Sequence, residues 1–508
     1  MKTPKNNGTF TNFACIKNIK HTMKRVTTIF FILLFVLIHV SAQPKREIRA
    51  AWLTTAYGLD WPRTRATSPD KMRKQQTDLL TILDKLKAAN FNTVLFQTRS
   101  RDDVFYYSKI EPMNQYLTDK IAGDPGYDPL TFVVNECHKR GMECYAWVVA
   151  IPLGSKKHVA SLGKRSALYH TSGICTTYKT EYFLNPAKPN TKIYLMDICR
   201  EITENYDIDG IVFDYLRYPE YCGNKFPDSA DYKKDGNGRS ILEWRRDNIT
   251  DIVRYLYNGI KAIKPWVKVC TCPVGKYRDT SRYTSHGWNA FSTVCQDPER
   301  WMREGIQDQI FPMMYFRGDN FYPFALDWYE QSNGRHIAPA LGTYFLLPQE
   351  GNWSFDDIMR QINFIRTNKL AGESHFRLEF LMKNTKGIYD GLANDKYLYP
   401  ALQPPTTWLD SIAPTAPYNL QVKHEEDNIT LTWKASRDND PRNAPMYVIY
   451  ASDTYPVDTT KPENIIAQRV SGTTYIYMPI ESWKTKNYFA VTAIDRYGNE
   501  GKAVQERM

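Results

Sequence analysis

The chain has 508 residues, which is too long for one ordinary compact domain and predicts two or more. With 42% apolar and 24% charged residues it has a globular composition, which excludes a long disordered tract. The formal charge of +11 is concentrated at the N-terminus: residues 1–42 hold six Lys or Arg and no acid, so the remainder carries 60 basic against 55 acidic residues. A surplus that small gives no reason to infer nucleic-acid binding.

The first 42 residues predict an export signal. Lys24 and Arg25 precede an apolar run from Ile29 to Val40, and Ser41-Ala42 completes the small-residue pattern of a signal peptidase site. The run is short for a membrane span, so an uncleaved anchor is the less favoured alternative. We therefore expect residues 1–42 to be a leader and signal peptide, the mature chain to begin near Gln43, and the protein to be exported to the periplasm or cell envelope.

Beyond the signal, strands alternate with helices. Strict alternation predicts a parallel sheet, and eight strand-helix units predict an α/β fold of the (β/α)8 TIM-barrel type over residues 43–403. An open doubly wound sheet is the competing arrangement, but no G-x-G-x-x-G or Walker motif follows any strand. The strand candidates are 48–53, 93–97, 143–150, 210–214, 267–273, 309–315, 337–343 and 375–381. Cys270 and Cys272, within the fifth of them, are expected to be buried thiols on opposite faces of the strand.

After the eighth unit the composition changes. Four prolines between 404 and 417 indicate a linker over residues 404–415, and residues 416–508 then consist of short strands and turns. The segments 429–433, 447–450 and 488–495 resemble the B, C and F strands of fibronectin type III domains, with Tyr488 placed like the tyrosine-corner residue. We expect an immunoglobulin-like sandwich that serves as a spacer or docking element, contacts the cell envelope and takes no part in catalysis. A cut near Pro414 should leave the barrel folded.

In such a barrel the chemistry lies where strands end, so acids at strand ends are the first candidates. Asp214 ends the fourth strand in line with Gly210 and Val212, and it projects into the mouth if those two line the interior. A carboxylate there can act as a nucleophile or stabilise positive charge on a sugar, and Arg217 can keep it ionised. A solvated salt bridge at a strand end fits the same pattern.

Several sequence motifs follow one another along the predicted barrel. They are Ile48 to Thr54, Phe96 to Arg99 followed by Asp103 and Tyr106, Gly126 to Leu130, Ala146-Trp147, Asp209 to Pro219, Pro312 to Tyr315, and Pro400 to Trp408. Together they resemble the glycosyl-hydrolase-like family 10 proteins, a bacterial group to which glycosidase activity is ascribed. The resemblance implies a TIM barrel that hydrolyses carbohydrate. Some relatives are associated with glycan strands of the cell wall, so the implied substrate is an oligosaccharide or a glycan strand.

The chain departs from this family at two places. Many relatives end the fourth strand with two consecutive acids, whereas here Tyr215 follows Asp214, which leaves the second carboxylate open. Relatives often place Asn and Arg after the third-strand Ala-Trp, and Val148 and Val149 stand there instead, which suggests an altered sugar subsite.

The proton donor has more than one candidate. Asp103 matches an acidic position of the family and ranks first; Glu379, placed on the eighth strand, ranks second, and Asp102 and Asp319 are further candidates. Asp103 can equally be a ligand for Arg99 or for a sugar hydroxyl.

Other side chains are candidates for binding the substrate. They are Gln97, Arg99 and Arg217 for hydroxyl groups, and Trp52, Trp147, Tyr218 and Tyr315 as aromatic surfaces, although such aromatic residues more often belong to a core. The histidines lack H-x-H and H-E-x-x-H spacing, so no metal and no cofactor is expected, and the absence of G-x-S-x-G disfavours an esterase. The alternative to a glycosidase is a barrel that binds glycans, or acts as a cell-envelope scaffold, without cleaving them.

Overall fold

The structure is a computed structural model that describes residues 43–282, 287–425, 428–478 and 486–506. The predicted leader and signal peptide of residues 1–42 lie outside the described residues. Within the described ranges, no helix is both long and apolar enough to cross a membrane.

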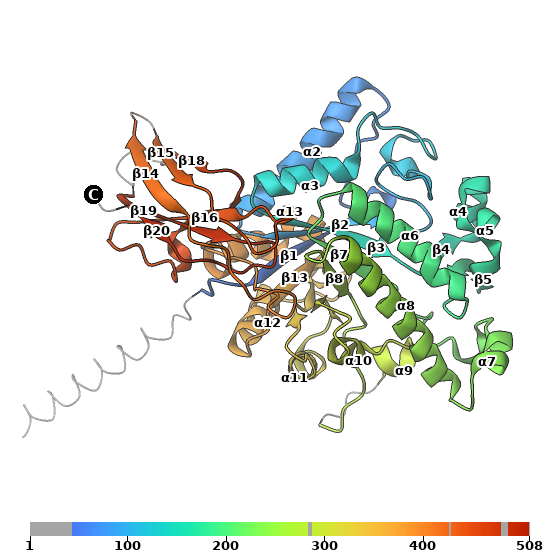
Figure 1. Ribbon diagram of the computed structural model, residues 1–508. Helices are drawn as coiled ribbons and strands as arrows, with labels where there is room; N and C mark the ends of the chain where they lie inside the picture. The colour runs from blue at the N-terminus through green and yellow to red at the C-terminus, as the bar shows by residue number, and fades with distance from the viewer. Residues whose placement is uncertain (1–42, 283–286, 426–427, 479–485, 507–508) are drawn as a thin grey trace, which may run out of the picture. The chain divides into compact units, whose positions relative to one another are not determined.

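Parallel strand segments form one sheet at the centre of the larger, N-terminal part of the described chain (Figure 1). In neighbour order they are β10 (Met313–Met314), β12 (Ala340–Gly342), β13 (Gly372–Phe376), β1 (Ile48–Leu53), β2 (Thr93–Arg99), β3 (Glu143–Val149), β7 (Gly210–Asp214), β8 (Lys268–Thr271), β9 (Gln309–Ile310) and β11 (His336–Ile337).

β9 and β10 are two parts of one interrupted strand, and so are β11 and β12. Gln309 pairs with His336 and Met313 pairs with Ala340, so the two ladders keep one register. Pro312 lies between β9 and β10, and Pro339 lies between β11 and β12. A proline has no N–H to donate to a ladder, which explains the interruptions. β9 also pairs with β8, β12 with β13, and β13 with β1. The succession of neighbours therefore returns to its start, and the sheet is an α/β barrel.

Helices cover the outside of this sheet (Figure 1). The local sequence explains where they begin: Ser68 accepts a hydrogen bond from the Lys71 amide before α2, and Ser354 and Asp357 form a capping box before α12. The main covering helices are α2 (Pro69–Ala88), α3 (Pro129–Lys139), α6 (Pro189–Asn205), α8 (Ile241–Ile263), α10 (Pro298–Arg303), α11 (Tyr322–Glu330) and α12 (Phe355–Thr367).

The barrel interior is filled by its own cluster of buried side chains. The Trp52 ring on β1 lies 4.9 Å from Trp147 on β3 and 5.8 Å from Phe311, between centroids. Cys270 and Cys272 both belong to this cluster. The expectation that they face opposite sides is wrong, because residues two apart on a strand share a face.

The eighth strand ends earlier than predicted. β13 stops at Phe376, and residues Leu378–Met382 form the helix α13, so Glu379 lies in a helix and not on the strand. Asp60 accounts for the difference: its Oδ1 accepts hydrogen bonds from Arg377 Nη1 at 2.8 Å and from the Glu379 amide at 3.0 Å. These bonds fold the chain back toward the loop that follows β1.

A small substructure leaves the barrel after β3 and returns before α6; we call residues 152–184 the excursion. It contains the antiparallel sheet β4 (Pro152–Ser155), β6 (Glu181–Leu184) and β5 (Cys175–Tyr178), with the short helices α4 (Lys156–Leu162) and α5 (Ala167–His170). Figure 1 shows it beyond the carboxyl end of β3. A β3 strand that ends at Val149 thus delivers the excursion to the face of the barrel where strands end.

The C-terminal part of the chain is all-β. One antiparallel sheet has the order β14 (Tyr418–His424), β15 (Ile429–Lys434), β18 (Thr474–Tyr477), and the other has the order β17 (Ile465–Val470), β16 (Met446–Ser452), β19 (Tyr488–Ile494), β20 (Val504–Gln505). Trp433 from the first sheet and Tyr447 from the second pack at 5.0 Å between ring centroids, in a shared apolar core.

This all-β part is bonded to the base of the barrel, where strands begin. The guanidinium of Arg469 on β17 pairs with Glu143, the first residue of β3, at 3.2 Å and with Asp209, which precedes β7. Arg496 binds Asp207 through two hydrogen bonds of 2.7 and 2.9 Å. The side chain of Arg469 is only 12% exposed. The expectation of a spacer whose removal leaves the barrel undisturbed therefore does not fit these contacts.

Arg469→Ala should lower the free energy of unfolding by about 3 kcal/mol, because it leaves two buried carboxylates short of a partner. Urea denaturation of residues 43–508 measures this change. Lys423→Ala is the control, since Lys423 pairs with Glu425 within the all-β part and its side chain is 76% exposed, so its loss should change the free energy of unfolding far less. Equal effects of the two substitutions would mean that the contact at the base adds no stability.

Candidate active site

Asp214 is the last residue of β7 and is 6% exposed. Its Oδ1 accepts a hydrogen bond from the Tyr215 amide at 2.8 Å, and its Oδ2 accepts one from Trp147 Nε1 at 3.2 Å. Burial is the largest influence and raises the pKa of Asp214 overall, although the charge of Arg217, the Cys272 thiol and the hydrogen bonds from Tyr215 and Trp147 lower it in part. The carboxyl group is thus buried at the strand end among donors that favour its ionised form.

Contacts within the segment after Asp214 fix the positions of Tyr215 and Arg217. Tyr215 has a φ of 51°, in the left-handed region. The Arg217 guanidinium carbon lies 4.6 Å from the centre of the Tyr215 ring, and Arg217 Nη1 pairs with Glu220 at 3.1 Å. Arg217 Nε is buried and has no hydrogen-bond partner among the described residues. Arg217 therefore acts on Asp214 through its charge, while its hydrogen-bonded carboxylate is Glu220.

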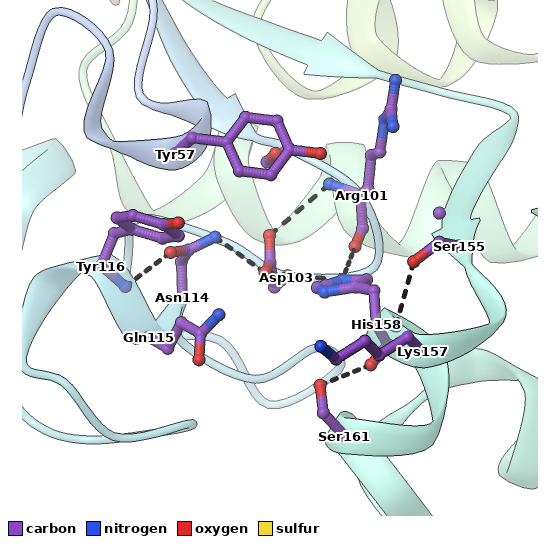
Figure 2. A pocket seen from close by; sticks show the side chains of 12 residues that line it. Tyr57, Arg101, Asp103, Asn114, Gln115, Tyr116, Ser155, Lys157, His158 and Ser161 are labelled. Carbon is purple, nitrogen blue, oxygen red and sulfur yellow. Dashed lines mark hydrogen bonds and ion pairs between the residues drawn. The ribbon is translucent and has the colours of Figure 1, made fainter.

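Asp103 lies in the loop after β2 and lines a cavity of about 310 Å³ (Figure 2). Its Oδ2 accepts a hydrogen bond from Asn114 Nδ2 at 2.7 Å and lies 3.7 Å from His158 Nε2. His158 comes from α4 in the excursion and donates from the same nitrogen to the Arg101 carbonyl at 2.7 Å. The cavity is also lined by Tyr57, Ser100, Gln115, Tyr116, Gly154, Ser155, Lys157 and Ser161.

Burial raises the pKa of Asp103 to about 6, against the opposing effects of the His158 charge and the Asn114 hydrogen bond. A carboxyl group with that pKa carries its proton in mildly acidic solution. Two tyrosines complete the cavity, with the Tyr57 and Tyr116 rings edge to face at 6.2 Å and Tyr57 65% exposed. The cavity therefore combines a protonatable carboxyl group with an exposed aromatic surface.

A second cavity, of about 230 Å³, connects this region with the segment after Asp214. Tyr215 and Arg217 line it, and Arg101 lines both cavities. The backbone joins the two carboxyl-bearing segments as well, since the Ala150 amide donates to the Asp214 carbonyl at 2.8 Å and the Ala150 carbonyl accepts from Arg99 at 3.1 Å. Asp103 follows four residues after Arg99 in the chain.

Arg99 itself is not available to a substrate. It is fully buried, and its guanidinium forms two hydrogen bonds of 2.7 Å with Glu111 and also binds the Val149 and Ala150 carbonyls. Desolvation would lower the pKa of Arg99, but Glu111 more than offsets this effect and keeps the group charged. The hypothesis that Arg99 binds sugar hydroxyls is thus corrected, because the partner of Arg99 is Glu111. Asp103, the other proposed partner of Arg99, does not pair with it.

Three further predicted binding residues also make internal contacts. Gln97 Oε1 accepts hydrogen bonds from the Thr55 and Ala56 amides at 2.9 and 2.8 Å, which fixes the loop after β1. Trp52 is 2% exposed and donates to Ser374 Oγ at 3.0 Å inside the barrel. Tyr218 is fully buried in the layer between strands and helices. Gln97 and Trp52 support the site from within and line neither cavity, whereas Tyr218 is one of the residues that line the second cavity.

Trp147 and Tyr315 lie near Asp214. Trp147 is bonded to its carboxylate, and the charge of Asp214 is among the causes that raise the pKa of Tyr315, after burial and Cys272. The Tyr315 ring stacks on Phe376 at 5.4 Å and meets Tyr344 edge-on at 5.6 Å. Tyr315 is half-buried, so one part of its ring stays accessible.

Glu379, the second candidate proton donor, lies elsewhere. It lines a third cavity, of about 490 Å³, together with Trp61, Ile82 and Met382. Burial raises the pKa of Glu379, but Lys383 and Arg377 outweigh this effect and lower it overall. A carboxylate that two cations hold in the ionised form is a poor proton donor. Asp319, a further candidate, is exposed in the short 3-10 helix at Gly318–Asn320.

Asp102 is buried and has a φ of 61°. Its Oδ1 accepts a hydrogen bond from the Ala167 amide at 3.0 Å, so it secures the start of α5 in the excursion. Burial, followed by the charge of Glu111, raises the pKa of Asp102 to about 7. Asp102 and Asp214 line neither of the two cavities, and Asp103 is the candidate proton donor that lines one of them.

Sequence reasoning missed Glu111, Asn114 and His158, which hold Arg99 and Asp103 in place. None of them stands at a strand end or in a periodic pattern, so the sequence carries no local signal for them. Cys272 was noticed only as a buried thiol; its S–H group donates to the Phe213 carbonyl, and the thiol is among the groups that lower the pKa of Asp214.

The sequence of the chain is similar to a known family and to several curated proteins. Residues 47–342 match the family described as Glycosyl hydrolase-like 10. The glycosyl hydrolase YngK of Bacillus subtilis (strain 168) is 31% identical over 486 residues, which cover 91% of this chain and 93% of that protein. The glycosyl hydrolase DigH of Escherichia coli (strain K12) is 32% identical over 295 residues, 54% of this chain and 66% of the relative.

Among solved structures, the glycoside hydrolase domain of PgaB from Bordetella bronchiseptica aligns with a TM-score of 0.47 at 12% identity, covering 69% of this chain and 98% of that one.

Trp147→Phe should raise the pKa of Asp214, because it removes an N–H donor that favours the carboxylate. NMR titration of 13C-labelled aspartate measures this pKa without any substrate. Trp52→Phe is the matched control: it removes an indole N–H from the same interior cluster, but that group donates to Ser374. A pKa of Asp214 that moves equally in both variants would show that the Trp147 hydrogen bond has no specific influence.

Proposed function

The chain belongs to the glycosyl hydrolase-like 10 family and is a glycosidase, and we propose that it hydrolyses O-glycosidic bonds of a polysaccharide or cell-wall glycan with Asp214 and Asp103 as its two carboxyl groups. The observation that carries this assignment is the difference between their surroundings. Asp214 accepts hydrogen bonds from a backbone amide and an indole, while Asp103 is buried with a pKa of about 6. Two carboxyl groups in different environments are the usual acid and base of a glycosidase.

In this mechanism Asp103 is the acid. Its proton passes to the glycosidic oxygen as the bond from that oxygen to the anomeric carbon breaks, so the leaving sugar departs as an alcohol. Asn114 and His158 hold the Asp103 carboxyl in the cavity. The exposed ring of Tyr57 offers an apolar face on which a sugar can stack.

Asp214 remains ionised and faces the positive charge that develops at the anomeric carbon. Its fixed donors prevent it from rotating away, and burial strengthens its attraction for that charge. A water molecule then supplies the hydroxyl group of the released sugar and returns a proton to the carboxyl pair.

The same proposal includes export and the identity of the all-β part. The basic residues, apolar run and small-residue site within 1–42 support a cleaved signal and a place in the periplasm or cell envelope. Seven strands in two antiparallel sheets, with Trp433 in their shared core, support a fibronectin type III domain. The return of strand neighbours to their start supports a TIM-type barrel.

Asp214→Asn and Asp103→Asn should each reduce reducing-sugar release from purified glycans by roughly 100-fold or more while the melting temperature changes little. Glu379→Gln is the control, since it removes a partly buried carboxylate at the third cavity and should retain activity within a few-fold. Full activity of Asp214→Asn would refute the catalytic assignment, and glycan binding by an inactive wild type would favour the non-catalytic alternative.

The pH dependence tests Asp103 separately. Because the acid must carry its proton, kcat/KM should fall as the pH rises through about 6, by about tenfold per pH unit beyond it. Asp103→Asn has no such proton to lose, so its low residual kcat/KM should be flat from pH 6 to 8. Measuring both profiles from pH 4 to 8 decides the matter, and a decline at high pH that persists in Asp103→Asn would assign the acid to another group.

A further inference from the structure

The excursion accounts for almost all of the net positive charge of residues 43–508. Residues 152–184 contain five Lys or Arg and one acid, Glu181, whereas the other residues from 43 onward hold 55 basic and 54 acidic side chains. All five cations are exposed: Lys156, Lys157, Lys164, Arg165 and Lys179. The surplus therefore lies on one small substructure instead of being spread over the surface.

These cations have no carboxylate partners. None of the five forms an ion pair with a described residue, and Glu181 is within 3.5 Å of Arg101. Cations on the barrel helices just beyond the excursion behave differently, since Lys188 pairs with Asp231 at 2.7 Å and Lys192 pairs with Asp251 at 2.6 Å. A group of like charges without partners attracts anions from solution.

The cluster also adjoins the candidate active site. Lys157 lines the cavity that contains Asp103, as Figure 2 shows, and Lys179 lines the second cavity beside Tyr215. Tyr169, from α5 between the two groups of cations, is 57% exposed. A polymer held in these cavities would thus pass over both charged and aromatic side chains of the excursion.

We propose that the excursion is a binding surface for the anionic groups of a polysaccharide, so that the enzyme acts on an acidic glycan. The inference rests on the proposed function and names the substrate class for it. A membrane surface fits less well, because the apolar residues of α4 and α5, such as Val159, Leu162 and Ala167, are buried and leave no apolar face to insert. The ammonium and guanidinium groups bind anions, and the exposed Tyr169 ring suits a sugar face.

The test measures binding in the Asp214→Asn background, where the polymer stays intact. The probes are polygalacturonate and its carboxyl-reduced, uncharged form, and isothermal titration gives the dissociation constants. Lys156→Gln, Lys164→Gln and Arg165→Gln are combined in one variant, because none of the three lines a cavity. Lys369→Gln, Lys434→Gln and Lys461→Gln form the matched control, which removes the same charge from exposed positions outside the excursion.

The excursion variant should bind polygalacturonate roughly tenfold more weakly, while the control stays within about twofold of the parent. The parent should bind the uncharged polymer more weakly than polygalacturonate, and raising the salt concentration should weaken only its binding to the charged polymer. The salt series needs no variant, so it tests the proposal even if the triple substitution fails to fold.

Equal affinities of the excursion variant and the control would overturn the proposal, as would equal affinity of the parent for both polymers. Vesicles of equal parts phosphatidylglycerol and phosphatidylcholine form the last arm. Excursion-dependent binding to the vesicles without binding to polygalacturonate would also overturn it, in favour of a membrane surface. Hydrolysis plays no part in these measurements, so an inactive wild type would refute the proposed function and leave this result standing.

Discussion

A buried guanidinium ties together the carboxyl ends of neighbouring strands, and the candidate active site is arranged around it. Arg99 ends β2, binds Glu111 through two hydrogen bonds, and donates to the carbonyls of Val149 and Ala150 at the end of β3. The Ala150 amide in turn donates to the Asp214 carbonyl at the end of β7. Removing either partner of such an ion pair would leave an uncompensated buried charge, so the pair stabilises the folded state only while both partners are present. Its position fixes the spacing of the loops that carry Asp103 and Asp214.

Charged residues at the two ends of the barrel have different surroundings. At the base, Glu143 is bonded to Lys268 at 2.7 Å and to Arg469, and Asp209 is bonded to His138 at 2.9 Å and to Arg469. These carboxylates are paired with cations, and Arg469 links the barrel to the all-β part. At the mouth, Asp103 and Asp214 are buried, and no Arg or Lys side chain of the described residues is hydrogen-bonded to either of them. Paired charges stabilise the fold, whereas a carboxyl group with a raised pKa is available for proton transfer.

The alternation of apolar strands and helices was sufficient to predict the α/β barrel and Asp214 at a strand end, because both follow from local periodicity. Other features depend on contacts between distant segments. Residues 375–381 fit a strand pattern, yet Asp60 binds Arg377 and the Glu379 amide and turns the chain into a helix. Arg99 looked like a residue for sugar hydroxyls because its partner, Glu111, lies in an irregular loop. His158 lies next to Asp103 but belongs to the excursion, and no repeat or motif in the sequence predicts the fold of the excursion.

Tyr215, which stands where many relatives have a second acid, contributes to the site in another way. A non-glycine residue in the left-handed region costs of order 1 kcal/mol, so other contacts must hold it there. The Tyr215 amide donates to Asp214 Oδ1 at 2.8 Å, and its ring lies against the Arg217 guanidinium. The strained backbone therefore aims an N–H group at the carboxylate, which favours its ionised form, and it leaves the tyrosine ring 37% exposed in the second cavity. Position 215 holds no acid, so the proposed mechanism takes its proton donor from the loop after β2, where Asp103 follows the Arg99 that is bonded to the end of β3.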